Sequence, residues 1–257
     1  MTIETWLRPG RPLVIGHRGH SMGAPEQTLA AYRRAIELGA DMIEADVRLT
    51  RDGVPVMMHD ETVDRTTSGH GPVAAFDLDA LRSLDAGAWF APEFAGERVP
   101  LLDELIALAD AAGVALCLEA KWATDDARGA RAMALGIASA IVGHERADRD
   151  VAASFDHASL REVHERHPEV AIAPDRLPER GMLEPAKLVA QARAIGAVII
   201  QHHHEDLAAP TVDACHAAGI AIWAWPVNRP DDIERMVRLG VDGVMGDDVA
   251  ALVAAVR

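Results

Sequence analysis

The 257-residue chain predicts an α/β fold of the (β/α)8 kind, the TIM barrel. Apolar runs of strand length alternate with stretches of helical character, which is typical of a parallel sheet covered by helices. The length matches the roughly 250 residues of a single such barrel. Glycines also follow several helical stretches at the position where a helix ends in the left-handed conformation, namely Gly39, Gly113, Gly196, Gly219 and Gly240.

The alternating runs predict nine strands and seven helices. The strands are expected at residues 13–17, 42–48, 54–59, 114–119, 151–155, 170–174, 197–202, 220–225 and 242–246. The helices are expected at residues 29–38, 101–112, 128–141, 160–166, 185–195, 210–218 and 231–239. Nine strands are one more than the barrel needs.

The extra strand is explained by a short connection. Residues 49–53, with the turn-forming pair Asp52-Gly53, separate the second strand from the third. A parallel crossover needs about a dozen residues or more, so these two strands are expected to form an antiparallel hairpin. Eight strands then remain, and the last, 243–245, is expected to close against the first. Residues 60–100 lack a clear period and are predicted to form a small inserted cap within one domain spanning 1–257.

Composition limits the partners and the location. The formal net charge of −15 argues against binding to nucleic acid or to an anionic membrane, because both would be repelled. No run of 18 apolar residues is present for a membrane span, and the first eleven residues lack the apolar stretch of a signal peptide. Cys117 and Cys215 lie in apolar runs and are predicted to be buried thiols in a reducing compartment. We therefore expect a cytoplasmic protein that acts on a small molecule.

Three acidic side chains stand at predicted strand ends. Glu44 and Asp46 occupy positions i and i+2 of one strand, so their carboxylates point the same way. Glu119 ends another apolar run, and Lys121 follows on the same face. Carboxylates on one face repel each other unless a cation or a proton lies between them. Hard oxygen ligands suit Mg²⁺ or Ca²⁺, so the three acids predict a site for one divalent cation, with Mn²⁺ as a further option.

An exposed pair of solvated acids is the alternative for Glu44 and Asp46 taken without Glu119. If the three acids do form one metal site, Asp46→Asn is expected to weaken metal binding without unfolding the barrel. Removal of one acid from this crowded anionic site relieves repulsion, so it is also expected to raise the stability of the metal-free protein.

Two histidines occupy the same kind of position. His17 ends the first predicted strand and His59 ends the return strand of the hairpin. Histidine titrates near neutrality and can take or give a proton, so these two are candidates for an acid–base pair. Arg18 offers a planar fork for phosphate oxygens and Lys121 a point charge. Together with a metal ion these groups are suited to cleavage of a phosphate ester.

With these residues in this order, the chain resembles the glycerophosphodiester phosphodiesterase family. The resemblance rests on His17-Arg18-Gly19, Glu44-x-Asp46-Val47 and His59-Asp60, and on further segments in the same order. These segments are Pro25-Glu26-Gln27-Thr28, Thr50-x-Asp52-Gly53, Pro55-Val56, Glu119-x-Lys121, Ser154-Phe155-Asp156 and Trp225-x-Val227-Asn228. They extend over nearly the whole chain.

The resemblance implies a (β/α)8 barrel with an inserted cap and a role for each matched residue. Glu44, Asp46 and Glu119 are implied to bind a divalent cation, and His17 and His59 to be the acid–base pair. Arg18 and Lys121 match positions that face the phosphate, and Trp225 matches one that lines the pocket.

Two supporting positions depart from the family pattern. Gln27 stands where asparagine is usual, and Pro226 stands where threonine is usual. Gln27 keeps an amide but moves it outward by one methylene, and Pro226 removes a backbone donor beside Trp225. We expect activity to be retained with an altered substrate preference. Glu26 is expected to contact and support the metal ligands, and the alternative is that it is itself a fourth ligand.

A run of three histidines begins at the end of the seventh predicted strand. In Gln201-His202-His203-His204-Glu205 consecutive side chains alternate between faces of a strand, so at most two share a face. Two ligands do not enclose a metal ion. A polar loop without function is the favoured interpretation, and the alternative is that one of these residues lines the substrate pocket from the strand end. Trp89, Phe90 and Trp122 are candidates for pocket walls or for ordinary core.

These observations predict metal-dependent hydrolysis of a glycerophosphodiester to sn-glycerol 3-phosphate and an alcohol such as choline or ethanolamine. The attacking group is water or the neighbouring hydroxyl of the glycerol itself. One alternative keeps the site but changes the substrate to a lysophospholipid or another phosphodiester, which a bulky apolar lining in the cap would favour. The other is a barrel that binds a phosphorylated ligand without catalysis.

Overall fold

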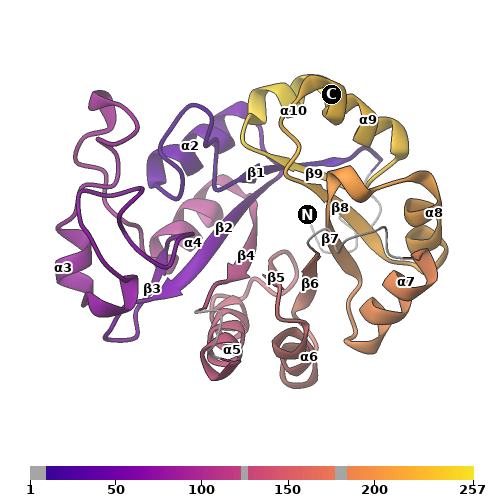
Figure 1. Cartoon of the computed structure of the whole chain (residues 1–257), viewed down its shortest axis with the longest axis horizontal. Coiled ribbons are helices and arrows are strands. Elements are labelled where there is room, and N and C mark those ends of the chain that lie inside the picture. The colour runs from indigo at the N-terminus through magenta and orange to yellow at the C-terminus, as the bar shows by residue number, and fades with distance from the viewer. Residues whose placement is uncertain (1–9, 123–126, 177–183) are drawn as a thin grey trace.

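The computed structural model describes residues 10–122, 127–176 and 184–257. Within these residues eight parallel strands close into a barrel and helices surround it (Figure 1). The order around the barrel is β1, β2, β4, β5, β6, β7, β8 and β9, and β9 pairs with β1 to complete the ring. The predicted fold class and the predicted closure of the last strand against the first are confirmed. The strands are β1 (Leu13–His17), β2 (Met42–Leu49), β3 (Pro55–Met57), β4 (Ala115–Ala120), β5 (Val151–Ser154), β6 (Ala171–Arg176), β7 (Ile199–His203), β8 (Ala221–Trp225) and β9 (Gly243–Gly246).

The ninth strand, β3, is the return strand of the predicted hairpin. It pairs antiparallel with β2, from Val47 opposite Met57 to Leu49 opposite Pro55. The turn between them is closed by a hydrogen bond from the Gly53 N–H to the Thr50 carbonyl at 3.0 Å. Gly53 has a φ of 81°, which glycine adopts without steric cost. The hairpin returns the chain to the carboxyl-terminal end of the barrel, where it delivers His59.

The helices form the outer layer and match the sequence expectations within three residues at each end. All five glycines predicted to end helices have positive φ, between 67° and 94°. The helices between strands are α2 (Leu29–Leu38), α4 (Leu102–Ala112), α5 (Ala127–Gly143), α6 (His157–Arg166), α7 (Pro185–Ala194), α8 (Ala209–Ala217) and α9 (Pro230–Leu239).

The last helix, α10 (Val249–Val256), is absent from the expectations drawn from the sequence. Its eight residues are all Ala, Val or Leu, so no polar face reveals a helical period. Its start is fixed by Asp248, whose side chain accepts a hydrogen bond from the Ala251 N–H at 3.1 Å. The helix packs against α2, α9, β1 and β9 and covers the seam where the barrel closes.

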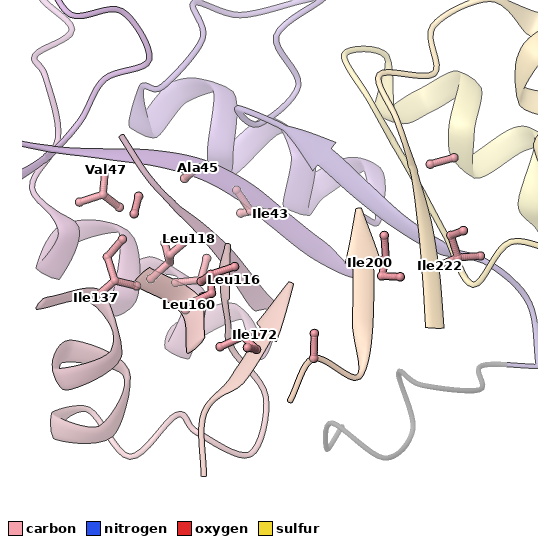
Figure 2. Packing of buried hydrophobic residues seen from close by; sticks show 14 of the residues in the cluster. Ile43, Ala45, Val47, Leu116, Leu118, Ile137, Leu160, Ile172, Ile200 and Ile222 are labelled. Carbon is pink, nitrogen blue, oxygen red and sulfur yellow. The ribbon is translucent and has the colours of Figure 1, made fainter. Parts of the chain in front are cut away.

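Alternation along the strands divides the core into two parts. Side chains that point outward pack between the sheet and the helices, as Figure 2 shows for Ile43, Leu116 and Ile222. Side chains that point inward fill the barrel. This inner cluster contains Leu13, Ile15, Met42, Ala115, Cys117, Val151, Ala153, Ala173, Ile199, Ala221, Trp223 and Met245. Both cysteines are buried and free, as the sequence predicts.

Residues 60–100 form an excursion beside β3 rather than a continuation of the barrel (Figure 1). It contains η1 (Val73–Ala75), α3 (Leu78–Arg82) and η2 (Pro92–Phe94). Its buried apolar side chains form a small core with Val56 and Met58 of the hairpin. Trp89 is 40% exposed, and Phe90 packs edge-on against both Trp89 and Phe94. The single-domain organisation and the role of this excursion as a substrate cap stay predictions.

A buried arginine ties together the loops that precede β4 and β5. Arg146 is 1% exposed and pairs with Asp150 at 2.5 Å and with Asp110. Its guanidinium also donates to the Val114 carbonyl at 2.9 Å. Asp150 in turn accepts from the Leu116 N–H at 3.0 Å. These bonds satisfy the backbone at the start of β4.

Replacement of Arg146 by leucine should lower the free energy of unfolding by about 3–5 kcal/mol, because it leaves the Asp150 carboxylate buried without its partner. Urea denaturation measures this change. Arg149→Leu is the matched control, since Arg149 is 37% exposed and pairs with the neighbouring Asp148. The control should change stability by less than about 0.5 kcal/mol. Equal small effects of both substitutions would contradict the structural role of Arg146.

Candidate active site

A cavity of about 300 Å³, here called the site cavity, lies at the carboxyl-terminal ends of the barrel strands. Seven of the eight site residues predicted from the sequence line it. The eighth, Asp46, lies beside Glu44 and Glu119 and is 1% exposed. The described residues that line the site cavity are His17, Arg18, Glu44, His59, Glu119, Lys121, Phe155, Asp175, Gln201, Trp225 and Met245.

The position of the site follows from the alternation of the strands. On β2 the inward positions are Met42, Glu44 and Asp46, so this face changes from apolar to acidic toward the strand end. On β4, Cys117 and Glu119 make the same change. Polar inward residues are therefore confined to the carboxyl-terminal end of the barrel, which is where (β/α)8 enzymes build their sites.

Glu44, Asp46 and Glu119 form what we call the acidic triad. Each offers one carboxylate oxygen, and these oxygens all lie within 4.8 Å of one another. The pairing of β2 with β4 places Asp46 opposite Glu119. All three side chains are buried, with 1–8% of their surface exposed. The structure thus brings together the three acids that the sequence singles out as metal ligands.

The ionisation of the acidic triad is strongly uneven. Burial raises the pKa of Glu44 well above its ordinary value, and the neighbouring Asp46 and Glu119 carboxylates add to the increase. Burial likewise raises the pKa of Glu119 to about 7, although Lys121 opposes the shift. Burial acts in the same direction on Asp46, but Lys121 and Arg18 outweigh it and hold the pKa of Asp46 below its ordinary value. Asp46 is therefore the carboxylate that the surrounding cations stabilise.

Two basic side chains compensate part of this charge. The Lys121 Nζ lies 2.5 Å from Glu119 and 3.1 Å from Asp46. The Arg18 Nε lies 3.3 Å from Asp46, and the Arg18 backbone N–H donates to the Glu44 carboxylate at 3.0 Å. Arg18 has a φ of 57°, a left-handed conformation that lets its backbone and side chain contact different acids. Both cations line the site cavity as well, so they can face a bound anion.

Gln27 explains how the departure from the family pattern is accommodated. The Tyr32 hydroxyl donates to the Gln27 Oε1 at 2.5 Å, which turns the Nε2 toward Asp46. That nitrogen donates to the Asp46 Oδ2 at 2.6 Å. Gln27 has a φ of 60°, so its backbone also adopts the left-handed conformation. The amide thus donates to the least exposed acid of the acidic triad.

Glu26 lies outside the acidic triad. It accepts hydrogen bonds from Arg18 at 2.9 Å and from Arg65 at 2.6 Å. Arg65 also binds Asp60 at 2.7 Å, so one chain of ion pairs connects Arg18 to the residue that follows His59. This arrangement matches the expectation that Glu26 supports the site from behind.

The Nδ1 atom of each of the two histidines contacts a carboxylate. The His17 Nδ1 lies 2.6 Å from Asp247, and the His59 Nδ1 lies 2.7 Å from Asp60. Asp247 is itself held by Asn228, whose Nδ2 donates to it at 2.6 Å. A carboxylate on Nδ1 fixes the ring orientation and leaves Nε2 for another partner. Both rings line the site cavity, so the second nitrogen of each is the one available for chemistry.

Aromatic side chains form the partly exposed part of the site cavity. Trp225 packs edge-on against Phe155 and His203, with ring centroids 5.7 and 5.6 Å apart. Within the histidine run, Gln201 lines the site cavity and His203 supports Trp225. Across the described ranges the acidic triad is the one group of three acids, histidines or cysteines with metal-binding spacing, so the run of histidines encloses no such site there.

Sequence reasoning missed Asp247 and Asp175, and it assigned no role to Asp60. Asp247 follows β9 and lies 230 residues from its partner His17, so its role depends on closure of the barrel. Asp175 falls one residue beyond the predicted end of the sixth strand, which continues to Arg176. The alternation of inward positions, Ala171, Ala173 and Asp175, was the signal that could have found it.

Comparison with known proteins agrees with this geometry. Residues 17–251 match the model of the glycerophosphoryl diester phosphodiesterase family. The chain belongs to this family. A glycerophosphodiester phosphodiesterase of Caldanaerobacter subterraneus is 38% identical over 247 residues, which cover 96% of this chain and 98% of that protein. One from Bacillus subtilis is 31% identical and is matched over 93% of this chain and 84% of its own length.

Solved structures of the family have the same fold. A phosphodiesterase of Oleispira antarctica, solved in complex with the product sn-glycerol-3-phosphate, is 28% identical, with a TM-score of 0.83 over 96% of this chain and 97% of that one. A glycerophosphodiester phosphodiesterase of Agrobacterium tumefaciens is 26% identical, with a TM-score of 0.80 over 95% of this chain and 99% of that one. Across the described residues, no helix has both the length and the apolar character needed to cross a membrane.

The uneven ionisation corrects one expectation from the sequence. Asp46→Asn was expected to stabilise the metal-free protein by relieving repulsion. In the structure, however, Asp46 is the partner of both Lys121 and Arg18. Its removal takes away the counter-charge that these two largely buried cations share and leaves Lys121 with Glu119 and Arg18 with Glu26. The expected sign is therefore reversed.

Asp46→Asn should therefore lower the free energy of unfolding of the metal-free protein by about 1–3 kcal/mol, as expected for the loss of one charged partner when each cation keeps a second one. Glu44→Gln, two residues away on the same face, is the matched control. It should leave stability unchanged or raise it, because Glu44 is the acid whose charged form is disfavoured. Chemical denaturation with EDTA present measures both at pH 7.5. Stabilisation by Asp46→Asn would show that repulsion, and not ion pairing, dominates at this position.

Proposed function

We propose that this chain hydrolyses glycerophosphodiesters to sn-glycerol 3-phosphate and an alcohol, with one divalent cation bound by the acidic triad. The observation that supports this most strongly is the convergence in the site cavity of two carboxylate-backed histidines, two cations and the acidic triad. Membership of the glycerophosphoryl diester phosphodiesterase family supports the same reaction. A relative 28% identical to this chain was solved with sn-glycerol-3-phosphate, the product that the proposal names.

The acidic triad suits Mg²⁺ or Ca²⁺, and Mn²⁺ is the further option. Its donors are hard carboxylate oxygens, and the raised pKa values of Glu44 and Glu119 indicate a need for positive charge beyond Lys121 and Arg18. A bound cation supplies charge neutralisation for a non-bridging oxygen of the phosphate.

The remaining residues have roles that follow from their positions. Arg18 and Lys121 face the site cavity and bind the phosphate anion. One of the two histidines takes a proton from the attacking oxygen through Nε2, and the other gives a proton to the departing alcohol. Asp247 and Asp60 hold the two rings in orientation through Nδ1. Trp225 and Phe155 form the wall against which the alcohol packs.

The lining of the site cavity favours a compact diester over a lysophospholipid. Of the described residues that line it, none comes from the excursion 60–100, where a bulky apolar lining would be required. The apolar residues that line the site cavity are Phe155, Trp225 and Met245. A polar, deacylated glycerol is the better match, with choline or ethanolamine as the departing alcohol.

A cytoplasmic location is also part of the proposal. Cys117 and Cys215 are both buried and unpaired, which suits a reducing compartment.

Hydrolysis of glycerophosphocholine should be lost after treatment with EDTA and restored by Mg²⁺, Ca²⁺ or Mn²⁺. Release of choline and of sn-glycerol 3-phosphate is measured, with lysophosphatidylcholine as the comparison substrate. Glu119→Gln is the control, since it should require a higher cation concentration for recovery. Full activity in EDTA would reject the metal-dependent mechanism. Cation binding seen by calorimetry without turnover of any diester would favour the barrel that only binds a phosphorylated ligand.

His17→Ala and His59→Ala should each lower kcat by roughly 10²–10⁴-fold. KM should change much less, because Arg18, Lys121 and the acidic triad remain. The double variant should lose less than the product of the two single effects, since the residues act in one proton-transfer scheme. Loss of activity through KM, with kcat intact, would identify that histidine as a phosphate-binding residue instead.

A pH profile adds a second readout for His59. Burial lowers the pKa of His59, while its bond to Asp60 opposes the shift. Asp60→Asn removes the opposing effect, so the pKa of His59 should fall further. If neutral His59 is the base, the acid limb of the kcat profile should move to lower pH in Asp60→Asn. His70→Ala is a suitable control, because His70 is exposed and should leave the profile unchanged.

A further inference from the structure

An acid that the reaction does not use lies in the wall of the site cavity. Asp175 extends from β6 and is 5% exposed, and its Oδ2 is buried without a hydrogen-bond partner. Burial raises the pKa of Asp175 well above its ordinary value, and the charge on Glu119 adds to the increase. The backbone carbonyl of Asp175 accepts a hydrogen bond from His157 at 3.0 Å, but its side chain stabilises no turn or helix end within the described ranges. A buried carboxyl without a partner is costly, so its presence in a cavity wall points to a ligand.

The site cavity has two chemically different halves. Strands β1, β2 and β4 and the loop after β3 contribute the histidines, the cations and the acidic triad. Strands β6 to β9 contribute Asp175, Gln201, Trp225 and Met245, and Phe155 follows β5. The register of β6 and β7 places Asp175 directly opposite Gln201. In this second half, among the described lining residues, Asp175 is the single charged side chain.

The chemistry of Asp175 restricts what it can bind. In its ionised form it repels phosphate, and none of the cationic side chains described in the structure forms an ion pair with it. It therefore needs a neutral donor or a cation from the ligand. Asp175 and Gln201 are 5% and 2% exposed, whereas Trp225 and Phe155 are partly exposed. A compact hydroxyl fits the buried pair, and a bulky ammonium group fits the partly exposed aromatic wall, where cation–π contacts are available.

A donor without a partner lies in the same wall. The indole Nε1 of Trp225 is buried and has no hydrogen-bond partner. The Nε2 of Gln201 donates to the Sγ of Cys117 at 3.3 Å, and sulfur is a weak acceptor. A hydroxyl group both donates and accepts, so it complements a wall that offers an acceptor and weakly used donors.

We propose that Asp175, with Gln201 opposite it, is a specificity-determining subsite that accepts a hydrogen bond from a free hydroxyl of the glycerol moiety. This inference rests on the proposed hydrolysis of glycerophosphodiesters and names the part of the substrate that the second half of the site cavity selects. An acyl chain on that hydroxyl converts it into an ester, which has no O–H group to donate. Asp175 would then stay buried without a hydrogen-bond partner. The subsite thus selects deacylated diesters against lysophospholipids.

The experiment uses the full chain with Mg²⁺ and measures binding by calorimetry, so it does not depend on turnover. The ligands are sn-glycerol 3-phosphate and two analogues that each lack one hydroxyl, 1,2-propanediol 1-phosphate and 1,3-propanediol monophosphate. Asp175→Ala should weaken binding of sn-glycerol 3-phosphate by about 10- to 100-fold. For the analogue that lacks the bound hydroxyl, Asp175→Ala and the parent protein should bind equally. Asp175→Asn, which keeps an acceptor, should retain most of the affinity.

Stability provides the folding control. Asp175→Ala and Asp175→Asn should have an unfolding temperature equal to or above that of the parent, because both remove a buried carboxyl that lacks a partner. A fall in affinity together with a retained fold supports the subsite. Equal weakening of all three ligands by Asp175→Ala, or no weakening of any, overturns it.

The two proposals fail in different ways. If the parent protein hydrolyses glycerophosphocholine but the ligands show no dependence on Asp175, the subsite is rejected and the reaction stands. If the ligand pattern is as expected but no phosphodiester is hydrolysed, the reaction is rejected and the subsite stands. If the parent protein binds none of the three ligands, both are rejected.

Discussion

The repulsion among three buried carboxylates on β2 and β4 determines most of what surrounds them. Lys121 lies between Asp46 and Glu119, and Arg18 approaches Asp46 from the end of β1. Gln27 adds a neutral donor that Tyr32 holds in the required orientation. These partners favour the charged form of Asp46, whereas Glu44 remains an acid whose charge is poorly compensated. The site is therefore organised around a deficit of positive charge, which is the property that a divalent cation corrects.

The histidines depend on the same architecture at longer range. His17 ends β1, but the carboxylate that orients it follows β9 at the other end of the chain. These residues meet because β9 pairs with β1 and closes the barrel. Asn228, which follows β8, fixes Asp247 in turn. Closure of the barrel thus positions the His17 ring in addition to stabilising the fold, since an open sheet would leave His17 without its partner.

The sequence predicts the features that depend on local pattern. The hairpin follows from a connection too short for a crossover, and the positions of His17, Glu44 and Glu119 follow from apolar runs that end in a charged residue. The features that it does not predict depend on which residues face each other across the finished barrel. Asp247 and Asp175 are single acids at the ends of strands, and nothing near them in the chain identifies a partner. The sign of the effect of Asp46 likewise required knowledge that Lys121 and Arg18 both contact it. The helix α10 was missed for a different reason, because an all-apolar segment has no period to recognise.

The hairpin β2–β3 has a consequence for how such a protein can change. By returning the chain within a few residues, it supplies His59 from the same quarter of the barrel that supplies His17 and two members of the acidic triad. The histidines, the two cations and the acidic triad are thereby concentrated on β1 to β4 and the loops after them, and Asp247 contacts His17 from the end of β9. The rest of the site cavity is lined from the later strands, each of which is followed by its own helix. Under the proposed function, substitutions on β6 to β8 would then change which substrate is accepted while the histidines and the acidic triad keep their positions. Because of the hairpin, the residues proposed to cleave the bond and those proposed to select the substrate lie on different strands. The two groups can therefore vary independently in sequence.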